Sequence, residues 1–320
     1  MRKILVRTLI SLAFLGGLFC MIREDIPQIA SVLKNADLRL ILISVLLYLG
    51  TTLLLSWRMQ MIFVAAGAPI RWIESCNLTF IGFFFNNFLP TSVGGDIVKA
   101  MSAQRITGQS VKAVTCVLMD RIFGLFTFIL IPSVSLIFFL KGVGNPVVPV
   151  IVYSFLVVSI FCFFLLFNRD LARRFGIVET ILNKFKLGEK ARKLYDGLHA
   201  FRHHKLLIAQ AMLLSVVSQM AGIFVLYLMA VALGAQCSVI YFFMLVPVVS
   251  LLSMLPSLNG LGIRESGYIY FLKPYIGKEY AVAIGILGLG LLLLASVIGG
   301  LIYLFRHEYH VQFKKAASSS

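Results

Sequence analysis

Long apolar runs separated by short polar segments form most of the chain. A helix needs ~20 consecutive, mainly apolar residues to cross a bilayer, and six of the runs approach or exceed that length. The apolar N-terminal run lacks a small-x-small cleavage site, so we expect an uncleaved helix there and not a signal peptide. The pattern predicts six transmembrane helices, at 4–21, 38–57, 114–140, 147–167, 206–233 and 280–305.

Two further apolar stretches are too short for a simple crossing. The first, 77–90, would be ~21 Å long as a helix, and it ends in two asparagines and a proline; the second, 241–256, also ends in a proline. Because the six full spans already alternate correctly, each short stretch has to enter and leave the membrane by the same face. The pattern therefore predicts two re-entrant helical hairpins, the first opening to the cytoplasm and the second to the outside.

The two breaks share a motif. "LPTSVGGDI", from Leu89, and "LPSLNGLGI", from Leu255, both read L-P-[TS]-x-x-G-x-x-I, at an offset of 166 residues. Each half of the chain gives the order span, span, hairpin, span, beginning from opposite faces, which is typical of an inverted repeat. We expect one integral membrane domain over 1–320, with repeats at 1–141 and 146–307, a basic cytoplasmic loop at 168–205 and a flexible tail at 308–320.

Composition agrees with a polytopic membrane protein. Hydrophobic residues make up 60% of the chain and charged residues 13%, more apolar side chain than a soluble domain of this length can bury. The formal charge of +16 would suit nucleic acid, but the cations gather in loops between apolar runs, as the positive-inside rule describes. Loop 168–205 is the most basic of these. We therefore expect both termini in the cytoplasm and no nucleic-acid partner.

The hairpin breaks are candidate binding sites. Irregular backbone is tolerated at membrane depth only where protein or a wet cavity satisfies its polar groups. Glycines after the prolines allow tight turning, and helical runs at 96–104 and 264–272 follow, so that helix N-termini with unpaired N–H groups would face a central cavity and favour an anion such as a phosphate. The residues concerned are Pro90, Gly94, Gly95, Pro256, Gly260 and Gly262.

Charged residues in this apolar region each cost ~2.5 to 3.5 kcal/mol at mid-bilayer, so they need partners. Neighbours in sequence point ~100° apart on a helix, and we expect no pairing within Asp120–Arg121 or Arg264–Glu265. Our hypothesis is a central network in which Arg121 meets Glu265 or Asp96, while Lys99 or Arg264 stays available to a ligand. Purely structural ion pairs are the alternative. Asn87 and Asn259 fit either a cavity wall or a hydrogen bond between helices. The residues concerned are Asp96, Lys99, Asp120, Arg121, Arg264 and Glu265.

The basic loop contains a candidate amphipathic helix. In "KLGEKARKLYDGLHAFRHH", Leu187, Leu194, Leu198 and Phe201 fall at roughly helical spacing among basic residues. An interfacial helix on anionic headgroups and a solvated loop helix both fit this pattern.

Catalytic and metal chemistry is not expected. The cysteines show no CxxC spacing, the histidines lie in basic segments without a zinc-peptidase spacing, and no nucleophile accompanies a base. We expect no catalytic residue, no metal, no cofactor and no enzymatic activity.

The motifs resemble those of the lysylphosphatidylglycerol synthase transmembrane, or flippase-like, family: "NNFLPTSVGGDIVKAMSAQRITGQS", "VTCVLMDRIFG" and "PSLNGLGIRESGY". The resemblance implies a bacterial or archaeal inner-membrane protein that moves or processes lipids with polar headgroups. It matches Asn87, Pro90, Gly94, Gly95 and Asp96 to the first motif, Asp120 and Arg121 to the second, and Pro256, Asn259, Gly260, Gly262, Arg264 and Glu265 to the third. The aminoacyl-transferase domain of the full synthases has no counterpart here, so a stand-alone member is expected.

The function expected is translocation of an anionic phospholipid, isoprenoid or polyprenyl-phosphate-linked lipid through a central cavity between the hairpins. Without an ATP-binding P-loop, transport would be downhill, proton-coupled or driven by a partner. One alternative is a non-transporting lipid-binding partner of a lipid or glycolipid biosynthetic enzyme. The other, an enzyme that modifies lipid headgroups, is disfavoured by the missing catalytic groups.

Overall fold

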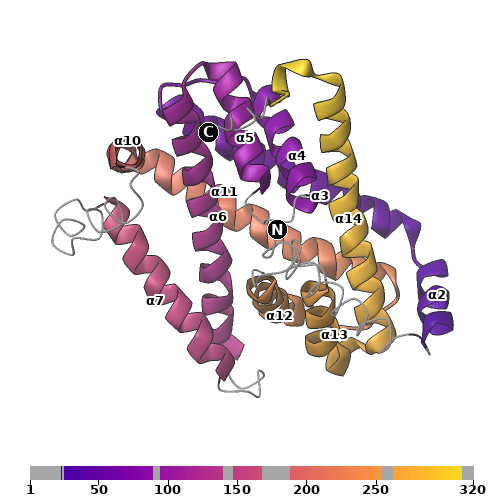
Figure 1. Cartoon of the computed structure of the whole chain (residues 1–320). Helices are drawn as coiled ribbons and strands as arrows, with labels where there is room; N and C mark the ends of the chain where they lie inside the picture. The colour runs from indigo at the N-terminus through magenta and orange to yellow at the C-terminus, as the bar shows by residue number, and fades with distance from the viewer. Residues whose placement is uncertain are drawn as a thin grey trace, which may run out of the picture.

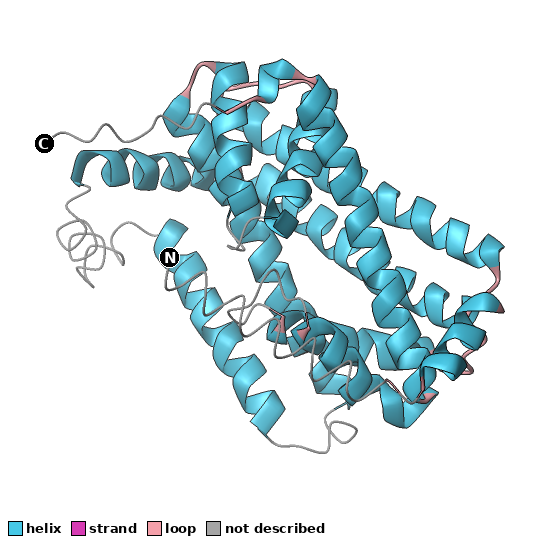
Figure 2. Cartoon of the chain, turned by 45° about the vertical axis from the view of Figure 1, so that its right-hand side comes forward, coloured by secondary structure: helices cyan, strands magenta, loops and turns pink. Residues whose placement is uncertain are grey.

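The computed structural model describes residues 23, 25–88, 94–139, 147–167, 188–253 and 262–311, and these are almost entirely helical, with short connecting loops (Figure 2). The predicted first span, 4–21, lies outside the described residues. The helices of the first half are α2 (Ile26–Lys34), α3 (Leu38–Ala65), α4 (Trp72–Phe88), α5 (Gly94–Thr107) and α6 (Ser110–Phe139). Those of the second half are α7 (Val147–Phe167), α10 (Gly188–Ala200), α11 (Lys205–Ala232), α12 (Val239–Leu252), α13 (Ile263–Ile276) and α14 (Lys278–Phe305), with 3₁₀ turns η2 (Phe201–His203) and η3 (His307–Tyr309).

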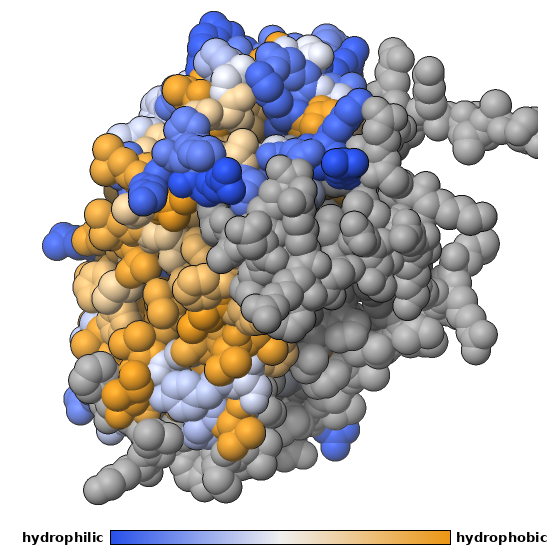
Figure 3. All heavy atoms as spheres, turned by 90° about the vertical axis from the view of Figure 1, so that its left-hand side faces the viewer, coloured by the Kyte–Doolittle hydropathy of each residue, from blue (hydrophilic) through white to orange (hydrophobic). Residues whose placement is uncertain are grey.

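Four helices, α3, α6, α11 and α14, are long and apolar enough to cross a membrane. Many of their large apolar side chains point away from the protein; Leu42, Leu46, Leu213 and Leu301 are each at least half exposed. Such a surface needs lipid around it, and Figure 3 shows it as a hydrophobic zone below a hydrophilic end of the molecule. The all-helical membrane architecture expected from the sequence is therefore confirmed. Helix α7 has the predicted bounds, whereas α3 runs on to Ala65 instead of ending at 57.

Two pairs of shorter helices occupy the positions predicted for the hairpins. The pair α4–α5 is called the first hairpin below, and the pair α12–α13 the second. Helix α4 packs against α5 so closely that a Cβ on Gly95 would lie 2.2 Å from the carbonyl oxygen of Gly82. Helix α12 packs against α13, where a Cβ on Gly267 would lie 2.9 Å from Val249. In Figure 1 the first pair lies in the upper half of the molecule and the second in the lower half, with α6 and α14 running the height of both. The breaks themselves, 89–93 and 254–261, lie outside the described residues.

The two halves pack against each other reciprocally. Helices α3 and α11 are both 28 residues long and contact each other extensively. Helix α14 packs against α4 of the first half, and α6 packs against α12 of the second. Helix α2 contacts α14, as α10 contacts α6. If α2, α3, α4 and α6 are matched with α10, α11, α12 and α14, exchanging each helix for its counterpart reproduces these contacts. The opposite orientation of the halves in a membrane stays a prediction.

The residues after α14 fold back onto the first hairpin. Tyr309 is 1% exposed, its hydroxyl accepts a hydrogen bond from Nδ2 of Asn77 at 2.9 Å, and its carbonyl accepts one from Ser102 Oγ at 2.8 Å. Asn77 belongs to α4 and Ser102 to α5. A flexible tail was predicted from residue 308, but the chain as far as Val311 is part of this packing; residues 312–320 lie outside the described residues.

Helix α10 packs against other helices of the protein, mainly α6. The sequence pattern suggested that Leu198 and Phe201 lie on lipid headgroups or on a solvated helix. Instead they are 9% and 2% exposed, and they join the core around α3 and α6. Neither alternative anticipated this, because an amphipathic pattern identifies the apolar face of a helix but not what covers it.

Candidate functional site

A buried ion pair joins α3 to α6. Nη2 of Arg58 lies 2.7 Å from Oδ1 of Asp120, and Nε donates to the same oxygen at 2.9 Å. Nη1 donates to Ser215 Oγ of α11 at 2.6 Å, and Nη2 also donates to the carbonyl of Asp120. Arg58 is 5% exposed and Asp120 9%. A single guanidinium thus holds three long helices together.

Lys99 of α5 approaches the same carboxylate from the other side. Its Nζ lies 3.9 Å from Oδ2 of Asp120, which is an ion-pair distance but too long for a hydrogen bond. The residue is 8% exposed. Asp120 is already occupied by Arg58, so the ammonium of Lys99 is weakly neutralised, and its three protons can serve another acceptor.

Arg121 pairs with the first hairpin, as one of the two predicted alternatives proposed. Its Nη1 lies 3.1 Å from Oδ2 of Asp96, in the first turn of α5. Adjacent residues on α6 therefore take different partners: Asp120 faces Arg58 and Lys99, while Arg121 faces Asp96. These five side chains are called the central charge group below. It contains three cations and two anions and carries a net charge of +1 (3 − 2).

Arg264 and Glu265 of the second hairpin neutralise each other. Nη2 of Arg264 lies 2.7 Å from Oε1 of Glu265, and Nε donates to the same oxygen at 3.1 Å. The expectation that these neighbours would not pair was wrong, because the long arginine side chain curls back along the helix surface despite the ~100° between the two positions. Arg264 is consequently less available to a ligand than the sequence suggested.

The N-termini of α5 and α13 both have an acceptor from within their own hairpin. Asn86 Oδ1, near the end of α4, accepts a hydrogen bond from the N–H of Gly95 at 2.9 Å. Glu265 Oε2 accepts one from the N–H of Gly262 at 2.7 Å. Gly262 has φ of 82°, in the left-handed region that favours glycine. The helix N-termini that were expected to hold an anion are thus partly satisfied by the protein, so the central charge group offers the stronger attraction.

Asn87 bridges two helices. Its Nδ2 donates to the carbonyl of Leu292 at 3.3 Å and contacts Ser296 Oγ, both in the middle of α14. Of the two roles left open for Asn87, the helix-to-helix hydrogen bond is the one seen, and it shows that α4 ends level with the centre of a full-length helix.

Four predicted site residues, Pro90, Pro256, Asn259 and Gly260, lie outside the described residues. Of the others, Asp96, Lys99, Asp120 and Arg121 lie where α5 meets α6. Gly94 and Gly95 begin α5, where Gly95 packs against α4, and Gly262, Arg264 and Glu265 lie on the second hairpin. Arg58 and Ser215 were not among the residues predicted from the sequence. Arg58 looked like the charged end of a span at 57, although the apolar run that continues to Ala65 was a signal that the helix goes on.

The central charge group contains no metal-ligand set, and no cluster of three or more His, Cys, Asp or Glu suited to a metal occurs among the described residues. With its two carboxylates bound to cations, the arrangement can attract and hold an anion.

Comparison with known proteins agrees with this architecture. A UPF0104 membrane protein of Pyrococcus horikoshii is 23% identical over 308 residues, which cover 87% of this chain and 90% of the relative. No solved structure is significantly similar to the chain. The family model described as the lysylphosphatidylglycerol synthase TM region matches residues 4–300. The chain therefore belongs to the family of the lysylphosphatidylglycerol synthase transmembrane region.

Proposed function

We propose that this protein translocates an anionic lipid, its headgroup passing between the two hairpins while the tails stay in the bilayer. In this proposal six spans and the two re-entrant hairpins form an inverted repeat in a bacterial or archaeal inner membrane, with both termini in the cytoplasm. The phosphate of a phospholipid, an isoprenoid or a polyprenyl-linked lipid is the group recognised, and no covalent chemistry takes place.

The observation that carries the proposal is the net positive charge of the central charge group. Lys99 is buried beside a carboxylate that Arg58 already neutralises at 2.7 Å, while its own ammonium stays 3.9 Å away. A cation that shares its carboxylate with a second cation is incompletely neutralised, which is costly at membrane depth and marks a candidate functional site. A lipid phosphate would supply the missing charge and accept the protons of Lys99.

Reciprocal packing supports a route to alternating access. The contacts of α4 with α14 and of α12 with α6 connect each hairpin to a long helix of the opposite half. Rocking one half against the other would alter both contacts and expose the space between the hairpins first to one side and then to the other. The pair Arg121–Asp96, between α6 and the first hairpin, and the pair Arg264–Glu265, within the second, would keep these four charges neutralised during that motion.

The test is leaflet exchange in proteoliposomes. The purified full chain is reconstituted with headgroup-labelled phosphatidylglycerol or phosphatidylcholine, and the labelled lipid in the outer leaflet is followed over time together with its chemical identity. Faster exchange of the anionic lipid without a new product is expected. A chemically altered lipid would overturn the non-enzymatic proposal, and binding without exchange would favour the non-transporting lipid-binding partner.

A further inference from the structure

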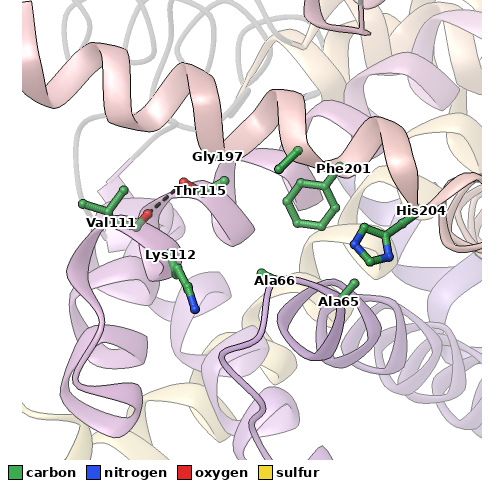
Figure 4. Close-up of a pocket in the computed structure, with 9 residues that line it drawn as sticks. Ala65, Ala66, Val111, Lys112, Thr115, Gly197, Phe201 and His204 are labelled. Carbon is green, nitrogen blue, oxygen red and sulfur yellow. Dashed lines mark hydrogen bonds between the residues drawn. The ribbon is translucent and has the colours of Figure 1, made fainter.

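A pocket of about 180 Å³ lies outside the central charge group, where α10 covers the junction of α3 and α6. Its walls include Ala66 after the end of α3, Lys112 and Thr115 from the start of α6, and Ala200, Phe201 and His204 from the end of α10 and the turn that follows (Figure 4). Pockets that bury a whole drug-sized ligand measure roughly 300 to 1,000 Å³, so this one suits a headgroup and not an entire lipid.

Two side chains that line the pocket, Lys112 and His204, can donate hydrogen bonds into it, whereas the hydroxyl of Thr115 donates to the carbonyl of Val111. Lys112 is exposed, and its Nζ donates to the carbonyl of Gly67 at 3.1 Å, which uses one of its three protons. The imidazole of His204 is also exposed and offers a donor in either tautomer. Figure 4 shows both side chains bordering the open space beneath α10.

Two helix N-termini strengthen the positive potential of the pocket. Helix α6 begins at Ser110 and α11 at Lys205, and neither has an acidic residue in its first turn. His204 is the N-cap residue of α11, and its side chain makes no capping bond. The carboxylate nearest in sequence, Asp196, lies one residue before Gly197 and is not part of the pocket lining. Both helix dipoles therefore present their positive ends without a carboxylate from their own first turns.

The corresponding place in the other half shows what such a cation pairs with. There α2 packs near the start of α14, and Nζ of Lys278, the first residue of α14, lies 2.5 Å from Oδ2 of Asp25, just before α2. At the α10 pocket the described residues provide Lys112 with a carbonyl only. The protein thus supplies an internal carboxylate at one end of the molecule and leaves an open pocket at the other.

Apolar side chains surround these donors. Val64, Val111 and Leu206 are 54%, 42% and 72% exposed. Val111 lines the pocket, and the other two are close in sequence to the lining residues Ala65 and His204. Cationic and apolar groups side by side suit an amphipathic anion.

We propose that the α10 pocket binds a phosphate group, carried by an anionic phospholipid or by a soluble phosphate. The basic loop 168–205, which makes the two halves unequal, then has a physical role, since its described part provides one wall of the pocket. The proposal does not depend on lipid translocation, because the pocket and the central charge group share no residue.

Calorimetric titration of the purified full chain in non-ionic detergent tests the pocket. The probes are dihexanoyl-phosphatidylglycerol, dihexanoyl-phosphatidylcholine and inorganic phosphate. We expect phosphatidylglycerol to bind at least about tenfold more tightly than phosphatidylcholine, because charge-assisted hydrogen bonds are stronger than neutral ones. Comparable binding of inorganic phosphate would assign the site to a soluble phosphate; weak binding would assign it to a lipid headgroup.

Four variants locate the binding. Lys112→Gln removes a pocket cation and Ala200→Leu fills the space, and each is expected to weaken binding of the anionic probe at least about fivefold. Lys273→Gln, which removes an exposed cation from α13, is expected to leave it unchanged. Unaltered affinity in both pocket variants, or loss of binding in Lys99→Gln alone, would overturn the pocket proposal without bearing on translocation.

Discussion

The guanidinium of Arg58 lies 2.7 Å from the carboxylate of Asp120, and both residues are less than 10% exposed. The pair connects α3 to α6, and Ser215 extends it to α11. Removing one member of a buried ion pair leaves the other charge uncompensated, which costs ~3 to 5 kcal/mol. We therefore expect Arg58→Met to lower the midpoint of thermal unfolding in detergent strongly.

The matched control for this variant is Arg71→Met. Arg71 pairs with Glu74 at 2.8 Å, but its side chain is 75% exposed, so water replaces the lost partner and the midpoint should hardly move. The double variant Arg58→Met/Asp120→Leu should recover part of the loss. Equal midpoints for Arg58→Met and Arg71→Met would show that the buried pair does not stabilise the helix junction.

Close packing of α14 on α4 depends on Gly299. A Cβ at this position would lie 1.9 Å from the carbonyl oxygen of Phe80, and a backbone atom cannot move aside as a side chain can. Gly299→Ala should therefore reduce the amount of folded protein recovered and its thermal midpoint. Gly290→Ala, on the same helix with no atom within 4 Å of the added Cβ, should be neutral or slightly stabilising through helix propensity. Similar behaviour of the two variants in thermal unfolding would contradict the packing described.

Tyr309 holds the end of the described chain onto the first hairpin. Burial raises the pKa of its hydroxyl, so the hydroxyl stays protonated at neutral pH. Tyr309→Phe leaves the amide of Asn77 without its acceptor, which should cost ~1 to 3 kcal/mol. Tyr309→Ala also opens a cavity and should cost ~3 to 5 kcal/mol. Tyr270, which is 74% exposed, provides the control Tyr270→Phe. If all three variants unfolded at the same temperature, the contact would not stabilise the hairpin.

The proposed inverted topology can be tested by labelling. In a chain whose five cysteines are replaced by alanine, a single cysteine is introduced at Gln109, between α5 and α6, or at Lys273, near the end of α13; both positions are exposed. An impermeant maleimide added to intact cells should react with Lys273→Cys and not with Gln109→Cys, since the two hairpins are proposed to open to opposite faces. Labelling of both positions from the same side would exclude an inverted repeat.

The sequence predicted the long apolar helices α3, α6, α11 and α14, because bilayer thickness ties span length to the length of an apolar run. The prolines in the sequence likewise indicated that α4 and α12 end near them, and the glycines indicated where α5 and α13 begin. Side-chain pairing was harder to predict. Arg58 follows an apolar run and resembles a helix end, and only the packing of α3 against α6 and α11 shows it to be buried.

The prediction that the sequence neighbours Arg264 and Glu265 would not pair was wrong for a related reason. Positions 264 and 265 diverge on a helical wheel, but a wheel ignores the length of an arginine side chain, which here reaches Glu265. The surface that α10 packs against could not be predicted either, because the same apolar pattern fits a helix on lipid headgroups, a solvated helix or a helix packed on the protein core. These features depend on tertiary contacts, whereas helix positions depend on local sequence.

In the translocation proposal, the net positive charge beside Asp120 serves an anionic headgroup as it passes. Leaflet exchange of labelled phosphatidylglycerol, measured in proteoliposomes with Lys99→Gln, Lys273→Gln and the unaltered chain at equal protein density, tests it most directly. Loss of one charge-assisted interaction of ~1.5 to 3 kcal/mol predicts exchange about ten to a hundred times slower for Lys99→Gln, with Lys273→Gln unaffected. Exchange by Lys99→Gln at the rate of the unaltered chain would contradict the account.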